Sequence, residues 1–317
     1  MTDGREPEEL RAAYERTVVE LGSVDPAMVV IEAGPAPPST AVRFATKFPE
    51  RSFLAGSSDP SPVILAAQKS EGGRAVFASG SVAQLVGPSY SALRESICRR
   101  RANVKLVALD GGLSPPSSAP FPPMLEDLGL LRGLPGMTVV VPADGPTTAA
   151  ATRALASFSG PAYLRLAPGI LPTVSDGTFQ IGRAPTVREG SDLTIVAVGA
   201  MLRTALDVAD ELARVGVSVR VLDFASVKPF DVKALLRAAR DTGAILTMEE
   251  HSVLTGVGAL VASATAEEAP VPVRRVGVPD VLVEPSGPGD ARDRLGLSKE
   301  RCLEEAWVLL RARGKVQ

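Results

Sequence analysis

The sequence predicts an α/β protein made of two doubly wound domains, each built on a mostly parallel sheet. Short apolar runs alternate with longer amphipathic segments along nearly the whole chain. This alternation is typical of strand–helix–strand units, which give parallel sheets covered by helices. A stretch rich in Pro, Gly and Thr interrupts the pattern after its first half, and 317 residues are enough for two domains of ordinary size.

The first domain is expected over residues 1–175. It begins with an amphipathic helix over residues 8–21, where Leu10, Tyr14 and Val18 recur at helical spacing. Apolar runs predict strands at residues 28–31, 52–55, 75–78, 104–109, 138–141 and 162–166. Periodicity predicts further helices at residues 40–48, 61–70, 82–98, 124–131 and 147–158. Residues 111–123 are rich in proline and serine, and we expect them to form a loop that faces a ligand.

Residues 176–190 are assigned as the linker, and the second domain is expected over residues 191–317. Strands are predicted at residues 193–198, 217–222, 244–248 and 273–278. Helices are predicted at residues 201–215, 232–239, 256–266 and 299–311. In the first of these helices Leu202, Ala205 and Leu212 share one face, which is the pattern of a helix packed on a sheet.

Composition excludes several classes of function. The formal net charge of -2 leaves no basic excess for binding nucleic acid. The polar N-terminus is not a signal peptide, and no apolar run approaches the roughly 20 residues of a membrane span. Two cysteines are too few for a disulfide framework, which favours a reducing, cytoplasmic location. A single histidine excludes a His-rich metal site, and no metal ligands are predicted.

Few residues suggest chemistry by themselves. His251 follows a predicted strand, where it is interpreted either as an acid/base or phosphate contact or as a histidine bonded to a neighbouring loop or subunit. Asp59 before Pro60 fits a helix N-cap. The arginines at positions 99–101 fit a solvated helix end better than a phosphate site. Without further information, the sequence indicates a two-domain α/β protein with no self-contained active site.

Several stretches in one order resemble the C-terminal half of transketolase-like enzymes, over residues 8–312. These stretches are LRGLPGMTVVVPAD at 131–144, GPAYLRL at 160–166, VKPFD at 227–231, EEH at 249–251 and RVGVPD at 275–280. The resemblance implies a transketolase pyrimidine-binding domain followed by a transketolase C-terminal domain. The family's diphosphate- and magnesium-binding half has no counterpart in the sequence, which implies a split enzyme with that half on a partner chain.

The resemblance also assigns candidate site residues. Asp59 stands where the family has the Glu that bonds the aminopyrimidine of thiamine diphosphate. Ser58, Asp59, Ser81 and Gln84 would line the cofactor's pyrimidine pocket, with Ser81, Gln84 and Gly87 in place of stacking aromatic residues. Asp110, Ser117 and Ser118 fall on the substrate side, and Pro168 replaces a phosphate-binding Arg. Asp59 and His251 are the catalytic candidates.

The resemblance implies a subunit that transfers a two-carbon ketol or acyl unit in a heterodimer or heterotetramer with the N-terminal, diphosphate-binding subunit. Thiamine diphosphate and Mg²⁺ are expected only in that complex, with no cofactor bound by the isolated chain. Two alternatives stay open. The chain is a catalytically silent scaffold or acceptor-presenting subunit of the complex, or it is a homomeric binding module that has lost thiamine chemistry.

Overall fold

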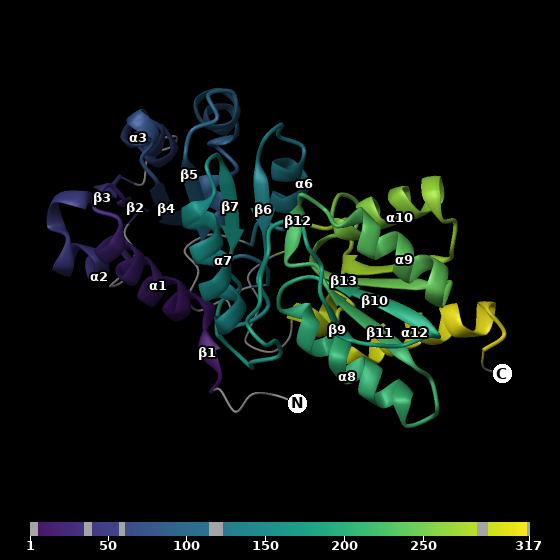
Figure 1. Ribbon diagram of the computed structural model, residues 1–317. Coiled ribbons are helices and arrows are strands. Elements are labelled where there is room, and N and C mark those ends of the chain that lie inside the picture. Colours follow the sequence, from purple (N-terminus) through teal and green to yellow (C-terminus); the bar gives the residue numbers. More distant parts are fainter. Residues whose placement is uncertain (1–5, 35–39, 57–60, 114–122, 284–290, 316–317) are drawn as a thin grey trace.

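The computed structural model describes residues 6–34, 40–56, 61–113, 123–283 and 291–315. These residues form two α/β domains that lie side by side, the first shown in purple to teal and the second in green to yellow (Figure 1). The predicted fold class is therefore confirmed. Within the described ranges, no helix is long and apolar enough to cross a membrane.

The first domain is built on a seven-stranded sheet. Its order is β12 (Ser226–Lys228), β6 (Thr138–Val140), β7 (Ala162–Arg165), β5 (Val104–Ala108), β4 (Val76–Gly80), β2 (Val29–Ala33) and β3 (Ser52–Ala55). All neighbouring strands are parallel except the β12–β6 pair. The carboxyl ends of β2, β3, β4, β5, β6 and β7 therefore share one edge, and we call this the carboxyl edge of the first sheet.

Helices cover both faces of this sheet. The helices α1 (Leu10–Val24), α2 (Thr40–Lys47) and α7 (Gly145–Ser157) lie on one face, where Phe77, Val107 and Leu164 enter a fully buried core. The opposite face carries α3 (Ser61–Lys69), the π-helical turn η3 (Leu93–Cys98) and α6 (Asp127–Arg132), with Leu106 and Tyr163 in their core. Because both faces are buried, the strands read as continuous apolar runs in the sequence.

The second domain has a five-stranded sheet with the order β14 (Val273–Val278), β13 (Ile245–Ser252), β10 (Leu193–Ala197), β11 (Val219–Asp223) and β9 (Thr186–Arg188). Only β9 is antiparallel to its neighbour. It lies within residues 176–190, so part of the predicted linker belongs to this sheet. Four helices cover the two faces: α8 (Met201–Ala213) and α12 (Lys299–Ala312) on one, α9 (Val232–Thr242) and α10 (Val257–Glu268) on the other.

Minor elements complete the described chain. A two-stranded sheet joins β1 (Glu8–Glu9) to β8 (Ile170–Leu171). Short helical segments are η1 (Pro49–Arg51), η2 (Glu71–Gly73), α4 (Val82–Leu85), α5 (Tyr90–Ala92) and α11 (Ala291–Arg294).

The two domains share a sheet and a core. Strand β12 belongs to the second domain in sequence, yet it extends the first sheet by pairing with β6, as Figure 1 shows between the domains. The Lys228 ammonium donates to the carbonyls of Arg132 and Leu134 at 2.8 and 2.6 Å. One buried cluster runs from Val139 of β6 to Val196 of β10 without a break. The relative position of the domains is thus fixed by main-chain pairing and apolar packing.

Two predicted elements need correction. The helix predicted over residues 82–98 is divided into α4, α5 and η3. Pro88 lies between α4 and α5, and proline both lacks a backbone donor and disfavours helical geometry in the residue before it. Strand β13 extends through residues 249–252, whereas the prediction ended it at Met248. Its polar residues are buried because the first domain packs against them.

Candidate functional site

Polar side chains gather at the carboxyl edge of the first sheet, the place where α/β proteins bind ligands. Ser81 follows β4 and caps α4, since its hydroxyl oxygen accepts a hydrogen bond from the Gln84 amide at 3.1 Å. Gln84 is buried, and its side-chain nitrogen lies 2.7 Å from where a Cβ on Gly34 would stand. Asp110 follows β5, and its carboxylate accepts a hydrogen bond from the Val82 amide at 2.7 Å.

The structure therefore brings together three of the predicted site residues: Ser81, Gln84 and Asp110. Burial raises the pKa of Asp110, while the Val82 amide and the Arg165 guanidinium act in the opposite direction. The remaining pocket and loop candidates, Ser58, Asp59, Ser117 and Ser118, lie outside the described residues. Their assigned roles stay predictions.

A buried ion pair lies beside Asp110. Arg165 ends β7 and Asp127 begins α6, and their side chains are 4% and 0% exposed. The guanidinium donates Nε–H and Nη2–H to the two carboxylate oxygens at 2.8 and 3.1 Å, and the Tyr163 hydroxyl donates to the same carboxylate at 2.6 Å. Bidentate, charge-assisted contacts of this kind fix both geometry and orientation. Neither Arg165 nor Asp127 was a candidate from the sequence.

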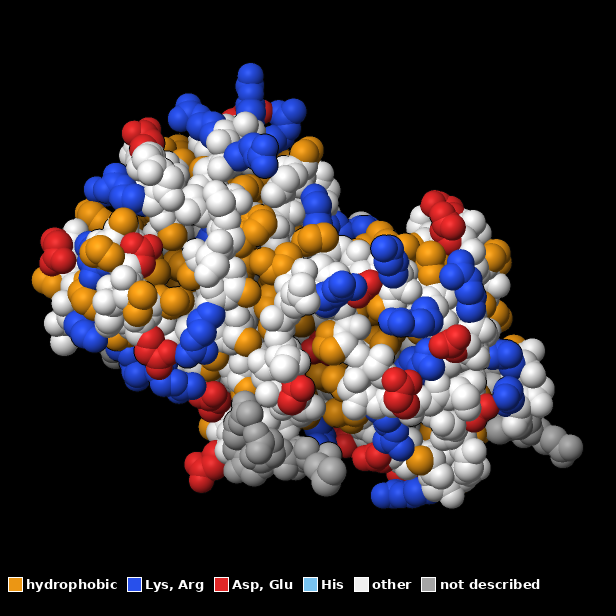
Figure 2. All heavy atoms as spheres, viewed as in Figure 1, with side chains coloured by type: hydrophobic (Ala, Val, Ile, Leu, Met, Phe, Trp, Pro, Cys, Tyr) orange, Lys and Arg blue, Asp and Glu red, His pale blue; other side chains and the backbone are white. Residues whose placement is uncertain are grey.

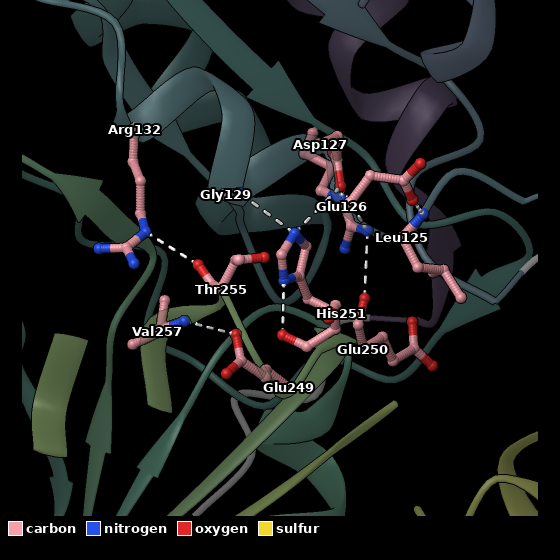
Figure 3. A network of polar contacts seen from close by, with 12 residues as sticks. Leu125, Glu126, Asp127, Gly129, Arg132, Glu249, Glu250, His251, Thr255 and Val257 are labelled. Atoms are coloured by element: carbon pink, nitrogen blue, oxygen red, sulfur yellow. Dashed lines mark hydrogen bonds and ion pairs between the residues drawn. The ribbon is translucent and has the colours of Figure 1, made fainter. Parts of the chain in front are cut away.

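His251 lies on the other side of Asp127, at the contact between the domains (Figure 3). Its Nε2 accepts a hydrogen bond from the Gly129 amide of α6 at 3.2 Å, so the other nitrogen, Nδ1, carries the proton and donates to the Ser252 carbonyl at 3.1 Å. Burial lowers the pKa of His251 to about 4. A neutral, fully buried imidazole bonded to two backbone groups matches the interpretation of a histidine that binds a neighbouring segment. Its catalytic role stays a prediction.

Glu250 connects the second domain to the residues that follow β5. Its backbone carbonyl accepts a hydrogen bond from Arg165 at 3.1 Å, and its carboxylate pairs with Arg292. The same carboxylate lies against Gly112, where an added Cβ would stand 2.4 Å from an oxygen. Arg165 lies equally close to Gly111, 2.3 Å from the position of an added Cβ. Two consecutive glycines thus allow the chain to pass between Arg165 and Glu250.

Glu249, on the same strand, has a different task. Its carboxylate accepts hydrogen bonds from the amides of Val257 and Gly258, both at 2.7 Å, at the start of α10. Burial raises the pKa of Glu249 to about 7, and the two amides oppose this shift. Glu249 therefore holds a helix of the second domain, as the Val257 contact in Figure 3 shows.

Other charged groups do not converge on this edge. The exposed arginines at positions 99–101 directly precede β5, at its amino end, and belong to the basic cluster at the top of the first domain in Figure 2. Arg99 pairs with Glu95 at 3.0 Å. Among the residues that the structure describes, no group of three or more His, Cys, Asp or Glu side chains could hold a metal ion.

The sequence contained one signal for the residues that were missed. Arg165 stands in an apolar strand, at a position that a parallel sheet buries on both faces. A buried arginine requires an anionic partner, so its presence indicates a buried carboxylate elsewhere. The identity of that partner, Asp127, depends on tertiary packing and could not be read from the sequence.

Two family models match the chain, one for each domain. Residues 7–173 match the transketolase pyrimidine binding domain, and residues 182–302 match the transketolase C-terminal domain. One of the two subunits of an apulose-4-phosphate transketolase from Phocaeicola vulgatus is 32% identical, over 93% of this chain and 96% of that protein. A 6-deoxy-6-sulfo-D-fructose transketolase subunit from a Clostridium species is also 32% identical, over 94% and 93%.

Solved structures agree with these matches. A split-gene transketolase, described as an inactive β4 tetramer, superimposes with a TM-score of 0.86 at 37% identity, covering 96% of this chain and 99% of that one. A transketolase from Campylobacter jejuni superimposes with a TM-score of 0.75 at 14% identity, and this chain covers 47% of it. The second similarity concerns the fold alone. In both comparisons the matched region contains the two domains described above.

Proposed function

The chain belongs to the transketolase family, and from this we propose that it is the C-terminal subunit of a split transketolase whose diphosphate- and magnesium-binding half is a separate chain. The observation that carries the proposal is correspondence in length. This chain and the apulose-4-phosphate transketolase subunit cover each other almost completely, at 93% and 96%. The assembly would be a heterodimer or a heterotetramer. Its place is the cytoplasm, because Cys98 and Cys302 are both free thiols.

The proposed reaction is the transfer of a two-carbon ketol unit from a ketose to an aldehyde. The bond between C2 and C3 of the donor breaks, and the same unit forms a new carbon–carbon bond with the acceptor's carbonyl carbon. The donor's remaining carbons leave as an aldehyde, so the exchange has no net oxidation or reduction. Thiamine diphosphate, when bound, supplies the carbanion equivalent for such a transfer.

The described residues would contribute binding and orientation rather than the whole cofactor site. Ser81 and Gln84 offer polar groups at the carboxyl edge, and Asp110 offers a carboxylate held by the Val82 amide. These groups suit hydrogen bonds to a heterocycle or a polyol. The described part of the chain has no metal cluster for a diphosphate, so these residues alone do not fit the complete cofactor. We therefore assign no chemical step to the cofactor on this chain.

A second candidate is a homo-oligomer of this chain without activity. It is favoured by one observation: the split-gene relative at 37% identity is described as an inactive β4 tetramer. That form and the proposed one are compatible, since a subunit can self-associate until its partner is present. In the alternative, the chain remains a scaffold even when the partner is bound.

Co-purification followed by an activity assay tests the proposal. Tagged chain would be isolated together with its diphosphate-binding partner, and donors would be apulose 4-phosphate and 6-deoxy-6-sulfo-D-fructose with D-glyceraldehyde 3-phosphate as acceptor. We expect ketol transfer by the complex and none by either chain alone. A complex that forms but transfers no unit from any ketose phosphate, with cofactor present, would favour the scaffold. Activity of this chain alone would contradict the proposal.

A further inference from the structure

The second domain contacts the candidate site through one carboxylate. Glu250 lies on β13, is 5% exposed, and pairs with the guanidinium of Arg292. Its other oxygen lies against the backbone of Gly112, which has a φ of +100° and therefore a conformation that only glycine adopts without strain. The Glu250 side chain thus contacts the first domain by packing, while its ion pair holds it from the second domain.

The segment that Glu250 contacts begins with Asp110. On one side, the Gly111 amide donates to the Leu166 carbonyl at 2.8 Å, and Arg165 lies against Gly111. On the other side, Glu250 closes the space over Gly112. The Asp110 carboxylate is then directed toward the Val82 amide at the carboxyl edge. Movement of Glu250 would therefore release the residue next to Gly111 and alter the direction of Asp110.

We propose that Glu250 is a positioning residue, through which the C-terminal domain holds Asp110 at the carboxyl edge of the neighbouring domain. This inference rests on the proposed function, since it assumes that substrate binds at this edge. Arg292 keeps the Glu250 carboxylate in place, and the backbone carbonyl of Glu250 holds Arg165 at the same time. The C-terminal domain thus shapes a site that it does not itself contain. An error of about 1 Å in such a site can cost roughly a hundredfold in rate.

The chain provides a closely matched control. Glu305 also pairs with an arginine, Arg274, and the two pairs have nearly equal burial: 5% and 41% for Glu250 and Arg292, against 7% and 46% for Glu305 and Arg274. Glu305 lies on α12, on the face of the second sheet where Cys302 and Leu309 are buried in that domain's own core. Glu305→Gln therefore removes a similar ion pair without touching the segment at Gly112.

The experiment compares Glu250→Gln with Glu305→Gln in the purified complex and in the full chain alone. In the complex, kcat and KM are measured with apulose 4-phosphate and D-glyceraldehyde 3-phosphate, and the Kd of thiamine diphosphate is measured by calorimetry. In the chain alone, hydrogen exchange is followed in peptides that cover residues 106–113. Arg292→Gln and its control Arg274→Gln repeat the comparison from the cation side, in case Glu250→Gln does not fold.

We expect Glu250→Gln to lower kcat/KM about tenfold or more with unchanged cofactor affinity, and to accelerate exchange over residues 106–113 about tenfold. Glu305→Gln should change neither quantity. Equal effects of the two variants on kcat/KM and exchange would overturn the proposal, as would faster exchange with unchanged kcat/KM. If the wild-type complex transfers no ketol unit, the proposed function fails. The exchange comparison then decides by itself whether Glu250 positions this segment.

Discussion

Replacement of Asp127 by Asn will destabilise the fold far more than its change of one atom suggests. Among the described residues, Asp127 is the only carboxylate that pairs with the Arg165 guanidinium, and both side chains are almost completely buried. Arginine does not lose its proton in proteins, so the charge of Arg165 would stay buried after the substitution. The Tyr163 hydroxyl would also lose its charged acceptor at 2.6 Å.

The size of the effect follows from these contacts. Removing one partner of a buried ion pair costs about 3–5 kcal/mol, because an uncompensated charge remains. The Asn carbonyl oxygen can still accept one hydrogen bond, which places the expected loss near the lower value, about 3 kcal/mol. The same change at Asp207 is the control, because Asp207 pairs with Arg203 through two contacts, at 3.1 and 2.6 Å, on an exposed helix face. An exposed i,i+4 pair contributes only about 0.3–0.5 kcal/mol.

Urea unfolding at fixed protein concentration measures both variants against the wild type. Protein concentration must be constant because self-association would change the apparent free energy of unfolding. We expect Asp127→Asn to lose about 3 kcal/mol and Asp207→Asn less than about 1 kcal/mol. Equal losses in the two variants, or a loss below about 1 kcal/mol for Asp127→Asn, would refute the view that this ion pair joins the sheet to α6.

Three further predictions concern pH and backbone geometry. Burial, with Asp144 nearby, raises the pKa of Asp223 to about 7, so this group loses stabilisation as pH rises from about 4 to 7; Asp223→Asn should gain up to about 1.4 kcal/mol per pH unit relative to wild type across that window, by urea unfolding. Burial lowers the pKa of His251 to about 4, so its contribution is lost as pH falls from about 6.5 toward 4; His251→Gln should remove this acid sensitivity in the same unfolding series. Gly112→Ala should lower the melting temperature more than Gly169→Ala, because both have positive φ but only Gly112 meets a buried carboxylate; equal shifts would show that φ strain alone matters.

The fold could be predicted because its strands carry a local signal. Residues 104–109 and 193–198 read as apolar runs, and both strands lie in parallel sheets covered on two faces. Elements that depend on the other domain gave no such signal. Strand β12 has three residues and exists because β6 offers an unpaired edge. The last residues of β13 are polar, and they are buried only because α6 packs on them.

The candidate site was predictable only in part, for a similar reason. Ser81, Gln84 and Asp110 follow strands, so their place at the carboxyl edge could be derived from the strand pattern. The network of Asp127, Arg165 and Glu250 joins residues far apart in the sequence. Pairings of that kind are set by the packing of two domains, and a single sequence does not contain them.

Titration with thiamine diphosphate tests the central claim most directly, namely that this chain is one half of a split transketolase. Calorimetry with Mg²⁺ present would be performed on the chain alone and on the complex with its diphosphate-binding partner. The account predicts no binding by the chain alone and saturable binding by the complex at micromolar concentration or below. A micromolar Kd for the chain alone would contradict it, and so would a stable complex that binds no cofactor.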